Sequence, residues 1–225
     1  MDLRTDPHTE ITYMKRRFLG KLGMGLLAGF ALAGACLAQT GDESPDALVK
    51  RLSTDVLEAI KADKSIQAGD IAKVVGLVES KVMPNVNFER MTASAVGPGW
   101  RQASPEQRKR LQDEFKILLV RTYAGALAQV NEQTITVKPL RAAAEDKEVV
   151  VRTEVKGRGE PIQLDYRLEK TPGQGAGWKI YNLNVLGVWL VETYRSQFAQ
   201  EINAKGIDGL ISALAERNKS NAKKS

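Results

Sequence analysis

The chain has 225 residues, of which 43% are hydrophobic and 27% are charged, and its formal net charge is +6 at pH 7. This composition is typical of one globular domain, and it excludes collagen-like, disulfide-rich and intrinsically disordered classes. Acidic residues are interspersed with basic ones almost throughout the chain. The sequence therefore contains no extended basic patch, and we expect no nucleic-acid partner.

Residues 1–38 are expected to be an upstream extension followed by a cleaved signal peptide. A basic segment, Lys15 to Arg17, precedes an apolar run from Leu22 to Ala38, which is the pattern of an export signal. The run is rich in Gly and Ala and is shorter than the roughly 20 apolar residues that a membrane anchor requires. Cys36 leaves a lipoprotein as an alternative, and the paired arginines leave a twin-arginine signal. We predict a periplasmic protein.

Cleavage at this place would remove the only histidine, His8, and the only cysteine, Cys36. The mature chain would then lack histidine bases, cysteine nucleophiles and the usual zinc ligands, so we expect no metal, no cofactor and no enzymatic activity. The alternative is an enzyme in which Asp165 and Tyr166 act as acid and base. A second alternative is an adaptor that binds only proteins and whose core is filled by its own side chains.

The first half of the predicted domain, residues 44–218, is helical. Apolar residues at helical spacing predict one helix from Ser44 to about Ile60 and another from Ala68 to Val82. A short helix is expected from Phe88 to Val96, before the Gly-Pro-Gly turn that follows. Ser104, Pro105 and Gln107 form the start signal of a long helix that reaches Val130.

The second half changes from helical to alternating periodicity, which predicts a curved antiparallel sheet of four strands. The expected strands are Gln133–Leu140, Lys147–Lys156, Pro161–Lys170 and Gly177–Leu186. Helices are expected at Val188–Asn203 and Asp208–Arg217, before a disordered tail at residues 219–225. Helices that are segregated from an antiparallel sheet indicate an α+β fold with helices on one face of the sheet.

Six stretches, in this order, resemble one known family, the periplasmic phospholipid-binding proteins of the Mla lipid-asymmetry pathway, also called the toluene-tolerance auxiliary family. They span most of residues 44–218. The stretches are KVMPNVNFERMT, VGPGWRQASPEQR, FKILLVRTYAGAL, PIQLDYRL, WKIYNLNVLGVWLVETYRSQF and GIDGLISAL.

The resemblance implies a nuclear-transport-factor-like sheet with helices, together with a helical subdomain. It implies a phospholipid as cargo rather than as a cofactor. It also implies two protein partners, an inner-membrane ABC transporter with a ring-forming lipid-binding subunit and an outer-membrane lipoprotein–porin complex. We expect the carrier to be a monomer. The sequence departs from the family pattern at three positions: Asn87 and Asn182 stand where Asp is common, and Trp189 stands where Ser is frequent.

Such a carrier needs a deep apolar cavity, because each exposed methylene costs about 0.8 kcal/mol. We predict that the cavity wall comes from the dry sheet face, the long helix, the closing segment and the Gly-Pro-Gly turn. Each wall residue has ordinary core packing as its alternative. Arg121, Arg167 and Arg195 are candidate phosphate neighbours, with solvated or ion-paired arginines as the alternative. The predicted lipid-binding residues are Trp100, Phe115, Leu118, Leu119, Tyr123, Val149, Val151, Leu164, Tyr166, Leu168, Val188, Trp189, Val191 and Tyr194.

Overall fold

The computed structural model describes residues 43–130, 132–143 and 145–222, and the predicted signal peptide lies outside these ranges. The first half is helical, as predicted. Its elements are α2 (Pro45–Ala62), α3 (Lys64–Gln67), α4 (Ile71–Leu77), the π-helical η1 (Val78–Val82), the 3-10 turn η2 (Met83–Asn85), α5 (Phe88–Val96), the 3-10 turn η3 (Gly97–Arg101) and α6 (Pro105–Ala128).

The long helix α6 begins where the sequence predicts. The Ser104 hydroxyl accepts a hydrogen bond from the Gln107 backbone NH, and the Gln107 side chain accepts one from the Ser104 NH. The predicted helix at residues 68–82 is less regular. It begins as α4 and widens to the π-helix η1, where the Ser80 hydroxyl donates to the Gly76 carbonyl oxygen at 2.7 Å and so competes with the regular backbone bonds.

The sheet has five strands in the described residues, so the predicted number of four is wrong. All neighbours pair antiparallel, in the order of the sequence. The additional strand has only two residues, and the sequence predicts both of them as the start of the closing helix. The strands are β1 (Thr134–Val137), β2 (Glu148–Lys156), β3 (Ile162–Lys170), β4 (Trp178–Val185) and β5 (Val188–Trp189).

The last element, α7 (Leu190–Ala222), corresponds to the two predicted closing helices. It is interrupted at Gly206, whose φ of 70° and ψ of −172° are conformations that glycine adopts readily. The helix continues to Ala222, which is four residues into the segment that the sequence predicts to be a disordered tail. None of the helices in the described ranges has the length and hydrophobicity that crossing a bilayer requires.

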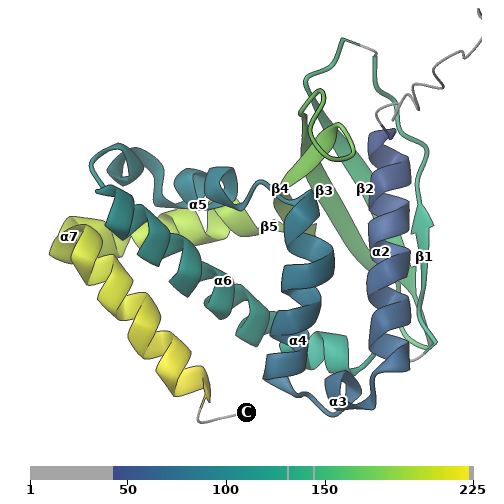
Figure 1. Ribbon diagram of the computed structural model, residues 1–225, viewed down its shortest axis with the longest axis horizontal. Coiled ribbons are helices and arrows are strands. Elements are labelled where there is room, and N and C mark those ends of the chain that lie inside the picture. Colours follow the sequence, from purple (N-terminus) through teal and green to yellow (C-terminus); the bar gives the residue numbers. More distant parts are fainter. Residues whose placement is uncertain (1–42, 131, 144, 223–225) are drawn as a thin grey trace, which may run out of the picture. The chain divides into compact units, whose positions relative to one another are not determined.

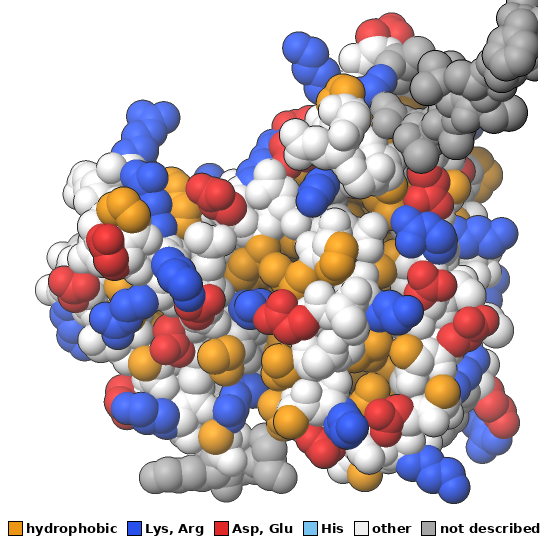
Figure 2. Space-filling model, in the orientation of Figure 1, with side chains coloured by type: hydrophobic (Ala, Val, Ile, Leu, Met, Phe, Trp, Pro, Cys, Tyr) orange, Lys and Arg blue, Asp and Glu red, His pale blue; other side chains and the backbone are white. Residues whose placement is uncertain are grey.

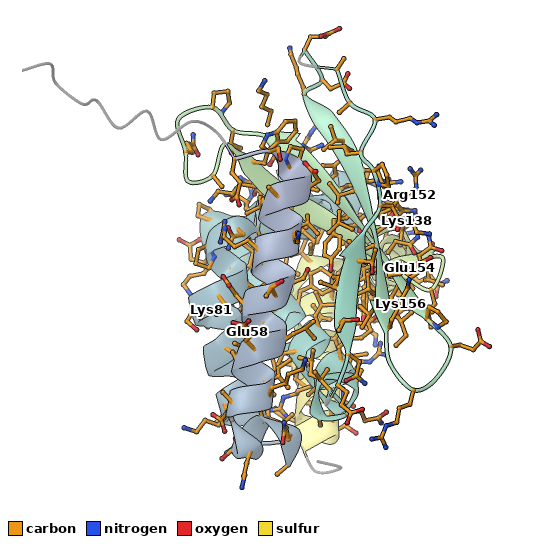
Figure 3. The ribbon with its side chains drawn as sticks, turned by 90° about the vertical axis from the view of Figure 1, so that its right-hand side faces the viewer. Glu58, Lys81, Lys138, Arg152, Glu154 and Lys156 are labelled. Atoms are coloured by element: carbon orange, nitrogen blue, oxygen red, sulfur yellow. The ribbon has the colours of Figure 1, made fainter. Side chains whose placement is uncertain are left out.

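Figure 1 shows α2 along the sheet, while α5, α6 and α7 group beyond the edge formed by β4 and β5. Charged side chains lie on the face of the sheet away from α2. Figure 3 shows Arg152, Glu154 and Lys156 on that side, while Glu58 of α2 lies on the other. We call the face toward α2 the dry face and the opposite one the wet face. The two faces therefore have the apolar and polar characters that the alternation in β3 predicts.

Three clusters of buried apolar side chains form the core. The helix cluster lies among α5, α6 and α7 and is centred on Phe115. The ring centroid of Phe115 is 4.9 Å from that of Tyr194 and 5.2 Å from that of Phe198. The sheet cluster joins α2 to the dry face. The joining cluster ties the end of α2, α3 and α4 to the second half of α6.

Candidate functional site: an apolar hollow beside the sheet

Strand β4 changes the face on which its apolar residues lie, because it contains a bulge. Leu168 of β3 pairs with Ile180, whereas Arg167 pairs with Asn182, so Tyr181 is an extra residue between two pairs. Beyond the bulge, Leu183 and Val185 therefore continue the dry face that Ile180 begins. Asn182 and Asn184 turn to the wet face.

Burial along this part of β4 is the reverse of what residue type predicts. Asn182 and Asn184 are 1% and 4% exposed, while Leu183 and Val185 are only partly buried, although β4 has neighbours on both sides at this end. The asparagine side chains tolerate burial because they hydrogen-bond with the backbone of the residues that follow β4. The Asn182 side chain accepts from the Val191 NH at 3.1 Å. The two apolar side chains pack against the helix cluster but are left partly exposed, which is unusual for apolar residues inside a sheet.

Other partly exposed apolar residues lie on α6 and just before α5. Leu119 and Tyr123 of α6 and Val86 before α5 pack at the border of the helix cluster and remain partly exposed. Figure 2 shows apolar side chains in a hollow bounded by α5, α6 and α4. An ion pair between Lys116 Nζ and Glu79 of η1, at 2.5 Å, joins α6 to the segment that follows α4. The arrangement suits an elongated apolar ligand.

Two tyrosines, Tyr166 at the sheet cluster and Tyr123 at the helix cluster, add polar groups beside these apolar side chains. Burial raises the pKa of Tyr166, whose hydroxyl hydrogen-bonds with the side chains of Ser53 and Thr153. Burial also raises the pKa of Tyr123, with a smaller contribution from Tyr194. Both hydroxyls are therefore neutral at physiological pH, and tyrosine is suited to a border between apolar groups and water.

The structure places the predicted lipid-binding residues in several environments. Phe115, Leu118, Val191 and Tyr194 are buried in the helix cluster, and Trp100 packs against it. Val149, Val151 and Leu168 are buried in the sheet cluster beneath α2. Leu119 and Tyr123 are half-buried against the helix cluster, Tyr166 is half-buried against the sheet cluster, and Leu164 is half-buried on the dry face.

The last two predicted residues, Val188 and Trp189, are brought to opposite faces by the turn before them. Val188 pairs with Val185 on the dry face but is 52% exposed. Trp189 pairs with Asn184, so it lies on the wet face, where the Arg167 guanidinium lies 4.0 Å from its ring centroid. The departure from the family pattern at Trp189 is thus on the side of the sheet away from the hollow.

The sequence reasoning missed Leu183, Val185 and Val86. A signal for the first two was present, because the apolar residues of this strand occupy even positions at Trp178 and Ile180 and odd positions after them. A change of parity within one strand is the mark of a bulge. No comparable pattern marks Val86, whose place depends on a bridge to Ile180.

On the wet face beside α5 and α7, two arginines contact glutamate side chains. Arg90 contacts both Glu148 and Glu169, and its guanidinium lies 3.7 Å from the ring centroid of Tyr181. The hydrogen bond from Arg90 is the main cause that lowers the pKa of Glu148. Arg167 forms an ion pair with Glu192 in the same way. Burial acts to raise the pKa of Glu192, but hydrogen bonds from Asn182 and Arg167 outweigh it and leave that pKa lowered.

A recess of about 230 Å³ opens on this wet face, and α5, β3, β4 and α7 all contribute to its lining. Arg195 lies at the recess and donates from Nε to the Ser94 carbonyl oxygen at 2.8 Å. The third candidate phosphate neighbour, Arg121, donates to the Asn218 carbonyl oxygen at 3.1 Å. Arg167 and Arg195 therefore face the recess on the wet side, and Arg121 contacts the end of α7.

The two asparagines at which the family commonly has Asp have structural partners here. Asn87 caps α5 by accepting from the Arg90 NH, and its side-chain NH₂ donates to Glu169 at 2.5 Å. An aspartate at this position would place a second negative charge against Glu169. Asn182 likewise donates to Glu192 at 2.8 Å, so in both cases the amide supplies a donor that a carboxylate lacks.

The proposed acid and base of an enzyme are not brought together. Asp165 pairs with Arg152 on the wet face, and Tyr166 pairs with Val151 on the dry face, so the two side chains project from opposite sides of β3. The Asp165 carboxylate accepts from Gln163 at 2.9 Å. No cluster of three or more potential metal ligands occurs within residues 43–130, 132–143 and 145–222.

Comparisons with known proteins agree on one family. The family model described as MlaC protein matches residues 50–216. A toluene tolerance protein of Pseudomonas putida is 30% identical over 189 residues, which cover 83% of this chain and 85% of the relative. The intermembrane phospholipid transport system binding protein MlaC of Haemophilus influenzae is 25% identical over 193 residues, covering 85% and 88%.

A solved structure is similar as well. It is a phospholipid-binding protein from Ralstonia solanacearum in complex with a phospholipid, 50% identical to this chain, with a TM-score of 0.75. The match covers 79% of this chain and 98% of the Ralstonia chain. The α+β fold and the family resemblance predicted from the sequence are confirmed. This chain belongs to the MlaC family.

Proposed function

We propose that the mature chain is a periplasmic carrier that holds the acyl chains of a phospholipid in the apolar hollow and leaves the head group in water. The observation that carries the proposal is the reversed burial in β4, where Leu183 and Val185 are more open than Asn182 and Asn184. Apolar side chains left half-open on a strand with neighbours on both sides are best explained by an apolar ligand that covers them.

The energetics of a phospholipid support this reading. Two long acyl chains in water represent on the order of 20 kcal/mol at about 0.8 kcal/mol per methylene, so a carrier must cover most of their length. A phosphate without partners is costly to bury, and it gains most by staying at the surface. The buried hydroxyls of Tyr166 and Tyr123 offer only neutral polar contacts inside, which suits an ester group better than a charge.

The relatives support the same cargo and a transport role. The Ralstonia protein binds a phospholipid, and the Haemophilus relative is named for intermembrane phospholipid transport. In this proposal the chain shuttles as a monomer between an inner-membrane ABC transporter with a lipid-binding ring and an outer-membrane lipoprotein–porin complex. The carrier is not an enzyme, and residues 1–38 direct its export and are removed.

The test is the lipid content of the purified protein and of wall variants. Leu119→Arg and Val185→Arg place a charge on the two sides of the hollow, and both should lose bound phospholipid while keeping the wild-type circular dichroism spectrum. Ala126→Arg, on an exposed part of α6, is the matched control and should keep it. Full lipid occupancy in folded Val185→Arg would remove the hollow as the site. Wild-type protein that never carries lipid would favour the protein-only adaptor.

A further inference from the structure

The turn between β4 and β5 carries an unfavourable residue. Its two central residues, Leu186 and Gly187, have φ angles of 52° and 87°, which is the pattern of a type I′ hairpin turn. The Asn184 side chain stabilises the turn by accepting from the Gly187 NH at 2.8 Å. Asn, Asp or Gly is preferred at both central positions, because other side chains are strained in the left-handed region. Among the residues that the structure describes, Leu186 is the only non-glycine residue with a positive φ.

Leu186 is also exposed, as are two apolar neighbours. Leu186 is 64% exposed, Val188 is 52% and Ile162 is 43%. The three lie together, because Val188 pairs with Val185 across the turn and the Leu186 NH donates to the carbonyl oxygen of Gln163, next to Ile162. We call these three residues the apolar tip. Backbone strain and apolar exposure combined at one turn point to a role on the surface rather than in folding.

At the edge strand β5, the chain passes from the apolar tip on the dry face to a patch on the wet face with the residue types that dominate protein interfaces. Trp189 follows Val188 directly, and the Arg167 guanidinium stacks on its ring. Arg167 also lines the 230 Å³ recess, together with Tyr181. Trp, Tyr and Arg are the residues on which binding energy at protein interfaces concentrates, and a recess beside them can receive a side chain.

The charges around the recess indicate what that side chain is. Arg167 is neutralised by Glu192. Arg195 bonds only to a backbone oxygen, and it has no acidic partner in the part of the chain that the structure describes. The recess thus keeps one positive charge, which a carboxylate would match. An anionic bilayer would instead be attracted by a cluster of unpaired basic residues, and a fluid bilayer has no fixed side chain to insert.

We propose that a lipid-accepting protein docks over the edge strand β5, where it covers the apolar tip on the dry face and the recess on the wet face. The partner presents an apolar patch to the tip and an Asp or Glu side chain to Arg195. The tip continues the dry face from Val185, so docking there would place the partner next to the hollow. This inference rests on the proposed carrier function.

The experiment separates lipid holding from lipid delivery. Leu186→Asn suits the turn and removes the exposed apolar group, and Arg195→Glu reverses the charge at the recess. Arg110→Glu is the control, because Arg110 is exposed on α6. Each protein is loaded with isotope-labelled phospholipid. Delivery is then measured to two acceptors: membrane vesicles from the source bacterium with their proteins, and liposomes made from the lipids of those vesicles.

Both variants should keep wild-type lipid occupancy but deliver to the protein-containing vesicles about tenfold more slowly, which is the loss expected at a central interface residue. Leu186→Asn should also be at least as heat-stable as the wild type. The proposal is overturned if both variants deliver lipid at the wild-type rate. It is also overturned if the wild-type protein delivers to the liposomes as fast as to the protein-containing vesicles, because the bilayer is then the partner. Lost occupancy in Arg195→Glu would assign that arginine to the lipid instead. A lipid-free wild type would refute the carrier function itself.

Discussion

The most informative perturbation is Val185→Trp, because it distinguishes an open hollow from a filled core. Forcing extra volume into a packed core typically costs 1–3 kcal/mol, and occasionally more. Val185 is only partly buried, so an indole there can lie against apolar neighbours and occupy part of the proposed acyl-chain site. At about 25 cal/mol per Å², burial of some 40 to 80 Å² of new apolar surface would stabilise the lipid-free protein by about 1–2 kcal/mol.

The matched control is Val151→Trp. Val151 lies on the same face of the sheet, two strands away, and is 0% exposed beneath α2. The assay is urea unfolding of delipidated protein together with the phospholipid content before delipidation. We expect Val185→Trp to be as stable as the wild type or more so, with reduced lipid, and Val151→Trp to be destabilised by at least 2 kcal/mol. If both variants lose the same stability, Val185 sits in packed core and the reasoning fails.

Three further predictions follow from single contacts. Phe115→Ala should lower the free energy of unfolding by about 3–5 kcal/mol in urea titrations, since the ring is fully buried among other rings, and a loss below 1 kcal/mol would contradict that packing. Gly206→Ala should cost about 1–3 kcal/mol, measured in the same way, because alanine is strained at that backbone conformation although space is free; an unchanged midpoint would argue against the kink. Arg90 lowers the pKa of Glu148 below 4.5, so this carboxylate stabilises the fold above that pH and the contribution is lost as the pH falls through the lowered value. Glu148→Gln should therefore flatten the loss of stability below pH 4.5 in melts across pH, and an unchanged slope would refute the assignment.

The main elements of the fold were predictable because local signals agreed with the tertiary structure. Ser104 and Gln107 mark the start of α6 by satisfying backbone groups that any helix leaves free, so this signal needs no knowledge of the rest of the chain. The alternation in β3 likewise predicts a sheet with one polar and one apolar face, which the register confirms.

The fifth strand could not be predicted from turn chemistry. A two-residue hairpin of type I′ is usually signalled by Asn-Gly, and here the first position is Leu186. The same residue hides the return of the chain, after which Trp189 pairs with Asn184 on the wet face. The unusual residue in the turn therefore explains why the fifth strand was not predicted.

The hollow itself was predictable only in part. The predicted wall includes the half-buried Leu119, Tyr123, Leu164 and Tyr166, because apolar periodicity marks which residues turn inward. Periodicity is the same for a residue that touches another side chain and for one that faces open space. The sequence therefore grouped Leu118, which is fully buried, with Leu119, which is half-open, and only the structure separates them.

The measurement that tests the account most directly is native mass spectrometry of the wild-type protein, purified without detergent from the source bacterium. The account predicts a bound mass of one phospholipid per chain in most molecules, which fragments to a head group and two acyl chains. It also predicts that Val185→Arg is folded and lacks this mass. Wild-type protein that is consistently free of lipid, or Val185→Arg that retains it in full, would contradict the claim that the hollow holds the cargo.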